Sequence, residues 1–197
     1  MTSPEDNEIE VKVLDIDVSA VEEKLRAVGC VYQGREFQQN YMFDYPDRRL
    51  YEQQDGSYVR LRRRHFLDQK RSEILLTYKQ TLSREKYKIA DETETRVDDF
   101  EQMHRFLGLM GLEEVRSDEK LRATYTYKDL HFEIDEWAGL PPYLEVEGSS
   151  EEKVAEGLAL LEFTLKDATA MNLREVLAKY KIKASHLHFK DFGREIL

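Results

Sequence analysis

The chain has 197 residues, which is enough for one domain with a sizeable hydrophobic core. A formal net charge of −10 argues against nucleic-acid binding through overall charge. The single cysteine, Cys30, excludes an intramolecular disulfide and a cysteine zinc site, which fits a reducing compartment. No apolar run is long enough to span a bilayer, and the N-terminus lacks a signal-peptide pattern. We therefore expect a cytoplasmic protein with neither a membrane nor a nucleic-acid partner.

The first structured segment, residues 8–14, alternates between charged and apolar side chains. In a strand Glu8, Glu10 and Lys12 share one face, and Ile9, Val11 and Val13 share the other. Two carboxylates and an ammonium so close together suit a site where a divalent cation meets a polyanion. For this segment alone, a sheet with one solvated, ion-paired face is the simpler explanation.

Alternating segments recur along the chain and predict eight strands, at 8–14, 31–44, 58–65, 73–80, 86–97, 115–127, 129–137 and 143–147. Helices are expected from Ser19, Asp98 and Ser149, and residues 149–180 look helical, with a second helix at roughly 169–180. We expect an α+β protein: an eight-stranded antiparallel β-barrel, closed or nearly closed, with flanking helices.

A single domain is expected over 1–197, with a core at 8–180. The tail, 181–197, has no clear role. It contains His186 and His188 two residues apart, where one strand face could present both to a metal. Such a pair is more often an ordinary surface feature.

Charged side chains repeat at a spacing of two residues on most of the predicted strands. The basic ones are Lys12, Arg60, Arg62, Arg64, Lys79, Arg96, Arg116, Lys120 and Arg122. The acidic ones are Glu8, Glu10, Glu92, Glu94, Glu133, Asp135, Glu145 and Glu147. If the sheet closes, these faces line its interior, where burial without a ligand would be very unfavourable. Because arginine and lysine suit phosphate oxygens and carboxylates suit Mg²⁺ or Mn²⁺, the pattern predicts metal-assisted chemistry on a phosphate chain.

These segments also resemble, in order, the motifs of the CYTH superfamily, or triphosphate tunnel metalloenzymes. The N-terminal hallmark is matched by Glu8-Ile-Glu10-Val-Lys12. Later matches are Val59-Arg60-Leu61-Arg62, Leu76-Thr77-Tyr78-Lys79, Lys120-Leu-Arg122, Ile134-Asp135-Glu136 and Leu144-Glu145-Val146-Glu147. The superfamily includes class IV adenylyl cyclases, thiamine triphosphatases and inorganic tripolyphosphatases. The ordered set covers about residues 8–147, and the C-terminal helices match more loosely.

The resemblance implies a tunnel that binds a triphosphate with Mg²⁺ or Mn²⁺. It suggests Glu8, Glu10, Glu145 and Glu147 as metal ligands, with Asp135 as an additional candidate. The phosphates would be held by Lys12, Arg60, Arg62, Lys79, Lys120 and Arg122. Of these residues, Glu8, Glu10 and Lys12 are the expected catalytic set. The chain departs from the family pattern at Asn40, Met42, Pro141 and Asn172-Leu173, which leaves the fine substrate preference open.

Three functions remain open on the sequence. We expect hydrolysis of a small-molecule triphosphate, in which water attacks a terminal phosphorus. The alternative is a class IV adenylyl cyclase, in which the ribose 3′-hydroxyl of ATP attacks the α-phosphorus and releases pyrophosphate. A catalytically silent polyphosphate or nucleotide-binding module is the third. Exposed strands and the unassigned tail leave room for a homodimer.

Overall fold

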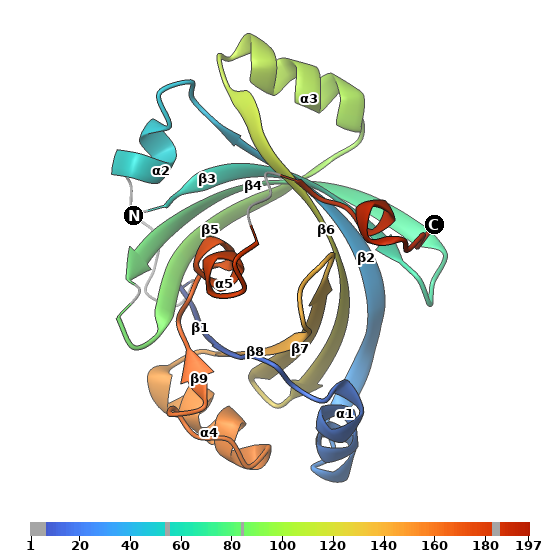
Figure 1. Ribbon diagram of the computed structural model, residues 1–197, viewed down its shortest axis with the longest axis vertical. Helices are drawn as coiled ribbons and strands as arrows, with labels where there is room; N and C mark the ends of the chain where they lie inside the picture. The colour runs from blue at the N-terminus through green and yellow to red at the C-terminus, as the bar shows by residue number, and fades with distance from the viewer. Residues whose placement is uncertain (1–6, 54–55, 84, 183–185) are drawn as a thin grey trace.

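The chain closes into a barrel of eight antiparallel strands (Figure 1). The computed structural model describes residues 7–53, 56–83, 85–182 and 186–197, with only the backbone of Asn7, Glu8 and Gln53. The strands are β1 (Asn7–Val13), β2 (Val31–Asp44), β3 (Tyr58–Phe66), β4 (Arg71–Ser83), β5 (Lys88–Val97), β6 (Glu113–Tyr127), β7 (Leu130–Trp137) and β8 (Tyr143–Gly148). They pair in the order β6-β2-β3-β4-β5-β1-β8-β7, and β7 pairs back onto β6 to close the ring. The predicted eight-stranded barrel is confirmed.

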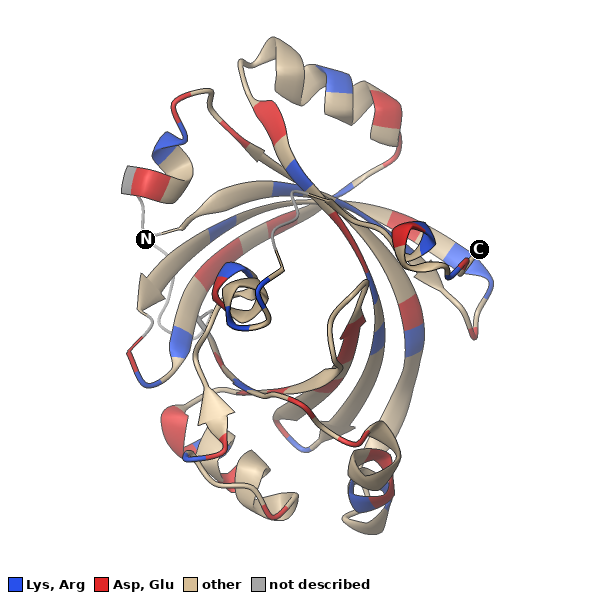
Figure 2. Cartoon of the chain, viewed as in Figure 1, with Lys and Arg blue, Asp and Glu red and all other residues tan. Residues whose placement is uncertain are grey.

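Alternation along each strand gives this barrel a charged interior and an apolar exterior. On β1, Glu10 and Lys12 face a cavity inside the ring, whereas Val11 and Val13 belong to a hydrophobic cluster outside it. Charged residues recur along the strands all round the ring (Figure 2). The apolar faces therefore need a cover on the outside, and the helices provide it.

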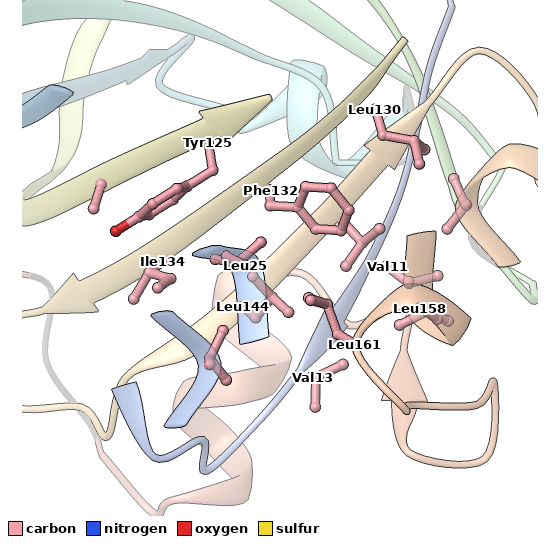
Figure 3. Close-up of a cluster of buried hydrophobic side chains, with 14 of the residues drawn as sticks. Val11, Val13, Leu25, Tyr125, Leu130, Phe132, Ile134, Leu144, Leu158 and Leu161 are labelled. Atoms are coloured by element: carbon pink, nitrogen blue, oxygen red, sulfur yellow. The ribbon is translucent and has the colours of Figure 1, made fainter. Parts of the chain in front are cut away.

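Two helices cover the outer faces of β1, β7 and β8. They are α1 (Val18–Ala27) and α4 (Glu151–Leu160), and their apolar residues join those of the strands in one cluster (Figure 3). Val11, Phe132 and Leu158 lie in it and are almost completely buried. Each such side chain contributes about 1.5–3 kcal/mol of hydrophobic stabilisation.

A third helix, α3 (Phe100–Leu109), covers another part of the barrel wall. Its Phe100 and Leu107 pack with Phe43 of β2 and Leu61 of β3. No helix in the described part of the chain is both long and apolar enough to cross a bilayer.

Helix starts differ by one or two residues from those expected. The first helix is capped by Asp17, whose carboxylate accepts a hydrogen bond from Ala20 N, and not by Ser19. The cap of α3 is Asp99 and the cap of α4 is Ser150, each one residue beyond the expected position. Neighbouring residues of similar capping ability compete for this role, and sequence pattern alone does not separate them.

The predicted helical region 149–180 contains two helices, and the second is shorter than the expected 169–180. The first helix in it ends at Leu160, and Glu162 adopts a positive φ of 62°. A two-residue strand, β9 (Ala168–Thr169), then pairs with β1. The chain becomes helical again at α5 (Leu173–Lys179), which begins with a capping box between Asn172 and Glu175.

The tail packs against the barrel wall. Its strand β10 (His186–Leu187) runs parallel to β6, and the 3₁₀ helix η2 (Phe189–Phe192) follows. Leu187 and Phe189 are buried in the cluster that includes α5. The Oγ of Ser117 lies 2.7 Å from His186 Nδ1 and 3.0 Å from His188 Nε2, so both histidines help fasten the tail to β6.

Gly139 provides a test of how tightly the tail packs against the turn after β7. Its φ of +77° would cost alanine about 1–2 kcal/mol, and an added Cβ would also overlap the ring of Phe192. Gly29 has a φ of +81° with nothing within 4 Å of an added Cβ, so Gly29→Ala carries the backbone cost alone. We expect Gly139→Ala to lower the free energy of unfolding by about 1 kcal/mol more than Gly29→Ala, because packing around Phe192 must also give way. If urea denaturation shows the same loss of unfolding free energy in both variants, the ring of Phe192 does not restrict this turn.

Candidate active site inside the barrel

A cavity of about 550 Å³ occupies the barrel interior. Its size falls within the range of small-molecule binding pockets, about 300–1,000 Å³. Most of the residues expected to form the site line it: Glu10, Lys12, Arg60, Arg62, Lys79, Lys120, Arg122, Glu145 and Glu147. The structure therefore brings together charged side chains from strands that are far apart in the sequence.

Two other expected site residues, Glu8 and Asp135, are not among the described residues that line the cavity. The backbone of Glu8 pairs opposite Ala90 in β1, but its side chain is outside the described residues. Asp135 is fully buried, and its carboxylate lies against Lys120 and Arg122.

Carboxylates of β1 and β8 meet around Lys12. The strands are antiparallel, with Glu10 opposite Glu147 and Lys12 opposite Glu145. Lys12 Nζ lies 2.8 Å from Glu10 Oε1 and 2.9 Å from Glu145 Oε1. Burial opposes charge on Lys12, but the two carboxylates outweigh it and raise the pKa of Lys12. Burial likewise opposes charge on Glu10, but its neighbouring lysines outweigh it and hold the pKa of Glu10 well below its ordinary value.

A second group of ion pairs joins β3, β4 and β5. Glu92 accepts from Arg60 Nη2 at 2.7 Å and from Lys79 Nζ at 2.8 Å. Burial would raise the pKa of Glu92, but these two cations outweigh it and lower that pKa to about 2. The sequence left the role of Glu92 and Glu94 open. Of the two, Glu92 lines the cavity, whereas Glu94 is partly exposed and accepts a hydrogen bond from Thr77 Oγ1.

Arg122 anchors the third group, on β6, β7 and β8. Its guanidinium binds Asp135 in a two-pronged arrangement, with Nε–Oδ1 and Nη2–Oδ2 both at 2.6 Å, and it also contacts Glu133 and Glu145. Lys120 Nζ lies 2.6 Å from Asp135 Oδ2, yet burial and the charge of Arg122 lower the pKa of Lys120 to about 8. Burial, together with the charges of Glu145 and Asp135, raises the pKa of Glu133 to about 7.

Removal of Asp135 is expected to destabilise the fold. Asp135→Ala leaves Lys120 buried without its carboxylate, and breaking a buried pair from one side costs about 3–5 kcal/mol. Denaturation by urea should show this loss, whereas Asp98→Ala, at an exposed position, should change stability by about 0.5 kcal/mol or less. A similarly small loss for Asp135→Ala would show that Lys120 does not depend on this contact.

Arg62 differs from the other strand cations that line the cavity because, within the described part of the chain, it forms no ion pair. Its Nε donates to Asn40 Oδ1 at 2.8 Å. Burial and the charges of Arg60 and Arg122 lower the pKa of Arg62 to about 9, so the guanidinium remains charged at neutral pH. The amide of Asn40 is itself almost fully buried, and its Nδ2 has no hydrogen-bond partner among the described atoms. Arg62 and Asn40 therefore both present donors without an acceptor at the cavity wall.

The chemistry of the acidic residues suits a hard divalent cation. Glu10, Glu145 and Glu147 all line the cavity from the paired strands β1 and β8, and they offer only oxygen donors, which Mg²⁺ and Mn²⁺ prefer. Among the residues that the structure describes, no three His, Cys, Asp or Glu side chains are arranged to hold a metal. These three glutamates fit a divalent cation by residue type and position, but Glu10 and Glu145 are engaged in ion pairs with Lys12 and Arg122.

Sequence reasoning did not assign several of the residues that line the cavity. Lys88 lies opposite Glu10, and its Nζ is 2.7 Å from Glu10 Oε1. The alternation that marks Glu92 extends back to Lys88, so the sequence did contain a signal for it. Glu133 was noted as a charged strand residue but was given no role.

One mouth of the cavity is formed by elements outside the barrel wall. The short helix α2 (Arg49–Gln53) follows β2, and α5 lies within the ring of strands in Figure 1. Asp44 fixes α2, because its carboxylate accepts from Leu50 N at 3.0 Å and Tyr51 N at 3.1 Å. The guanidinium of Arg174 lies 4.7 Å from the Tyr51 ring centre, which joins the two helices. No sequence signal pointed to this contact between distant segments.

Comparisons with known proteins agree with this architecture. A family model described as CYTH domain matches residues 6–176. A protein of Methanocaldococcus jannaschii named "Putative adenylate cyclase MJ0240" is 28% identical over 185 residues, covering 94% of this chain and 95% of its own. The PH1012 protein from Pyrococcus horikoshii OT3 has a similar structure, with a TM-score of 0.70 at 19% identity, covering 86% of this chain and 98% of its own.

A Hippeastrum protein, HpAC1, is also similar in structure. The TM-score is 0.64 at 17% identity, covering 90% of this chain and 97% of that one. HpAC1 is described as a "putative adenylyl cyclase" with a dominant triphosphatase activity. At this identity the likeness shows a shared fold.

Proposed function

The chain belongs to the CYTH domain family, and from this premise we propose that it is a divalent-cation-dependent enzyme that hydrolyses a triphosphate held in the barrel. The observation that carries the proposal is the environment of Arg62. A charged guanidinium beside Arg60 and Arg122, with no carboxylate partner among the described residues, calls for an anionic ligand. A phosphate chain carries several charges and suits the fork of an arginine.

The basic residues of the cavity would bind and orient that chain. Arg60, Arg62 and Lys79 face it from β3 and β4, while Lys120 and Arg122 face it from β6, and Lys12 from β1. Cations on several sides can hold the phosphates in line for attack, which is the main protein contribution to phosphoryl transfer. We propose that buried Asp135 positions Lys120 and Arg122 for this task.

The proposed metal ligands are Glu10, Glu145 and Glu147, with Glu8 from the same strand. When bound there, Mg²⁺ or Mn²⁺ would neutralise charge on the phosphate chain. Glu8, Glu10 and Lys12 remain the proposed catalytic set, and the 2.8 Å contact between Glu10 Oε1 and Lys12 Nζ on β1 supports the choice of these two. In hydrolysis, the oxygen of a water molecule bonds to the terminal phosphorus while the bridging P–O bond breaks, releasing orthophosphate. No side-chain nucleophile is required.

One observation favours the cyclase alternative. The cavity lining includes Tyr51, Met42 and Leu173, and inorganic tripolyphosphate has no apolar part that would use them. An adenine ring would. The M. jannaschii relative carries an adenylate cyclase name, whereas HpAC1 is described as mainly a triphosphatase.

A product screen tests the proposal. The protein is incubated with Mg²⁺ or Mn²⁺ and, separately, tripolyphosphate, ATP and thiamine triphosphate. We expect orthophosphate as the main product from at least one of them. Cyclic AMP as the main product from ATP would replace hydrolysis with cyclisation, and tight binding without turnover would indicate a binding module.

A further inference from the structure

The cavity neutralises itself through ion pairs that join the two halves of the proposed site. Lys12 Nζ is bonded to both Glu10 and Glu145, at 2.8 and 2.9 Å. The same Glu10 oxygen lies 2.7 Å from Lys88 Nζ, and Glu145 Oε2 lies 2.6 Å from Arg122 Nη2. The carboxylates proposed to hold a metal are therefore the partners of cations that face the phosphate chain.

Lys12, Glu10 and Glu145 cannot keep their ion pairs with one another and bind the two ligands at the same time. Only 4% of the Lys12 side chain and 8% of the Glu10 side chain are exposed, so solvent is a poor substitute for a lost ionic partner. A triphosphate that takes Lys12 leaves Glu10 with Lys88 and Glu145 with Arg122, so each buried carboxylate loses one of its cationic partners. A divalent cation that takes those carboxylates leaves Lys12 uncompensated. Only the two ligands together give a new partner to every group that loses one.

We propose that Glu10 and Glu145 act as internal competitors of the triphosphate, so that divalent cation and triphosphate bind with strong positive coupling. This inference rests on the proposed function and adds a regulatory property to it: the empty site binds either ligand alone more weakly than it binds both together. Coupling between ligands is reciprocal, and it commonly amounts to about 5–150-fold in affinity.

The sharpest test uses binding in the absence of metal. Tripolyphosphate is titrated calorimetrically, with EDTA present, into the wild-type protein and into Glu10→Gln. The glutamine keeps the shape of the side chain but releases its hold on Lys12 and Lys88, so we expect metal-free affinity to rise by about tenfold. Addition of Mg²⁺ should then improve binding less in Glu10→Gln than in the wild type.

Two further variants make the result interpretable. Glu145→Gln releases Lys12 and Arg122 and should also tighten metal-free binding. Glu36→Gln removes the same charge from another buried ion pair, 2.6 Å from Arg64 Nη2, but Glu36 is not among the described residues lining the cavity. Its metal-free affinity should match the wild type.

The possible results distinguish failure of the competition from failure of the triphosphate site itself. If the wild type binds tripolyphosphate with Mg²⁺ but neither glutamine variant binds it more tightly without metal, the competition is absent and the inference is overturned. An equal gain in Glu36→Gln would overturn it too, because general charge would then explain the effect. If the wild type binds no tripolyphosphate even with Mg²⁺, the proposal of a tripolyphosphate site fails as well.

Discussion

Arg62→Met is expected to weaken triphosphate binding by about 10- to 100-fold, since a hydrogen bond to a charged group contributes about 1.5–3 kcal/mol. The same change should leave the thermal midpoint within about 4 °C of the wild type. Stability is little affected because loss of the bond to Asn40 is offset by relief of repulsion from Arg60 and Arg122. Calorimetric titration and thermal unfolding measure the two quantities.

Arg64 supplies the matched control. It lies two residues further along β3, on the same face, but it is paired with Glu36 at 2.6 Å and Glu73 at 2.9 Å. Arg64→Met should therefore lower stability by about 2–4 kcal/mol and leave triphosphate affinity unchanged. If Arg62→Met instead lost stability and kept its affinity, Arg62 would be a structural residue and the anion site would lie elsewhere.

Glu147→Gln is expected to reduce metal-dependent turnover by about 10²–10³-fold while the protein stays folded. Glu147 faces the cavity directly opposite Glu10, and the amide that replaces it is a poor ligand for a divalent cation. Steady-state kinetics over a range of Mg²⁺ and Mn²⁺ concentrations, with circular dichroism as the folding check, provide the measurement.

Glu36→Gln is the control for Glu147→Gln as well. It removes a buried carboxylate of β2 that is bonded to Arg64 and is not among the described residues lining the cavity, so its turnover should stay within about twofold of the wild type. Full activity in Glu147→Gln would contradict its assignment as a metal ligand. Equal losses in the two variants would show that buried charge in general, and not this position, supports turnover.

Strand structure was predictable because its signal is local. Lys12 and Val11 lie on opposite faces of any strand, whatever surrounds them, so alternation gave both the charged interior and the apolar exterior. Barrel closure was expected from the eight alternating strands, and closure in turn implied that the charged faces line the interior and need partners there. Those partners were harder to foresee, because Lys12 meets Glu145 only through the pairing of β1 with β8.

Features that depend on distant contacts were not predictable in the same way. The short strands β9 and β10 exist because β1 and β6 offer them an edge, and neither has a periodic pattern of its own. The contact between Tyr51 and Arg174 needs two helices to meet across the cavity mouth. The helix starts at Asp17 and Asp99 depended on which of several neighbouring polar side chains reaches the backbone.

The central claim is that the charged barrel interior binds a triphosphate and a divalent cation together. A crystal structure with Mn²⁺ and a non-hydrolysable tripolyphosphate analogue tests it most directly, since anomalous scattering locates the metal. We expect Mn²⁺ beside Glu10 and Glu147, and phosphate oxygens about 3 Å from the Arg62 guanidinium. Phosphate density confined to the outer surface, with the interior ion pairs of Lys12 intact, would contradict the account.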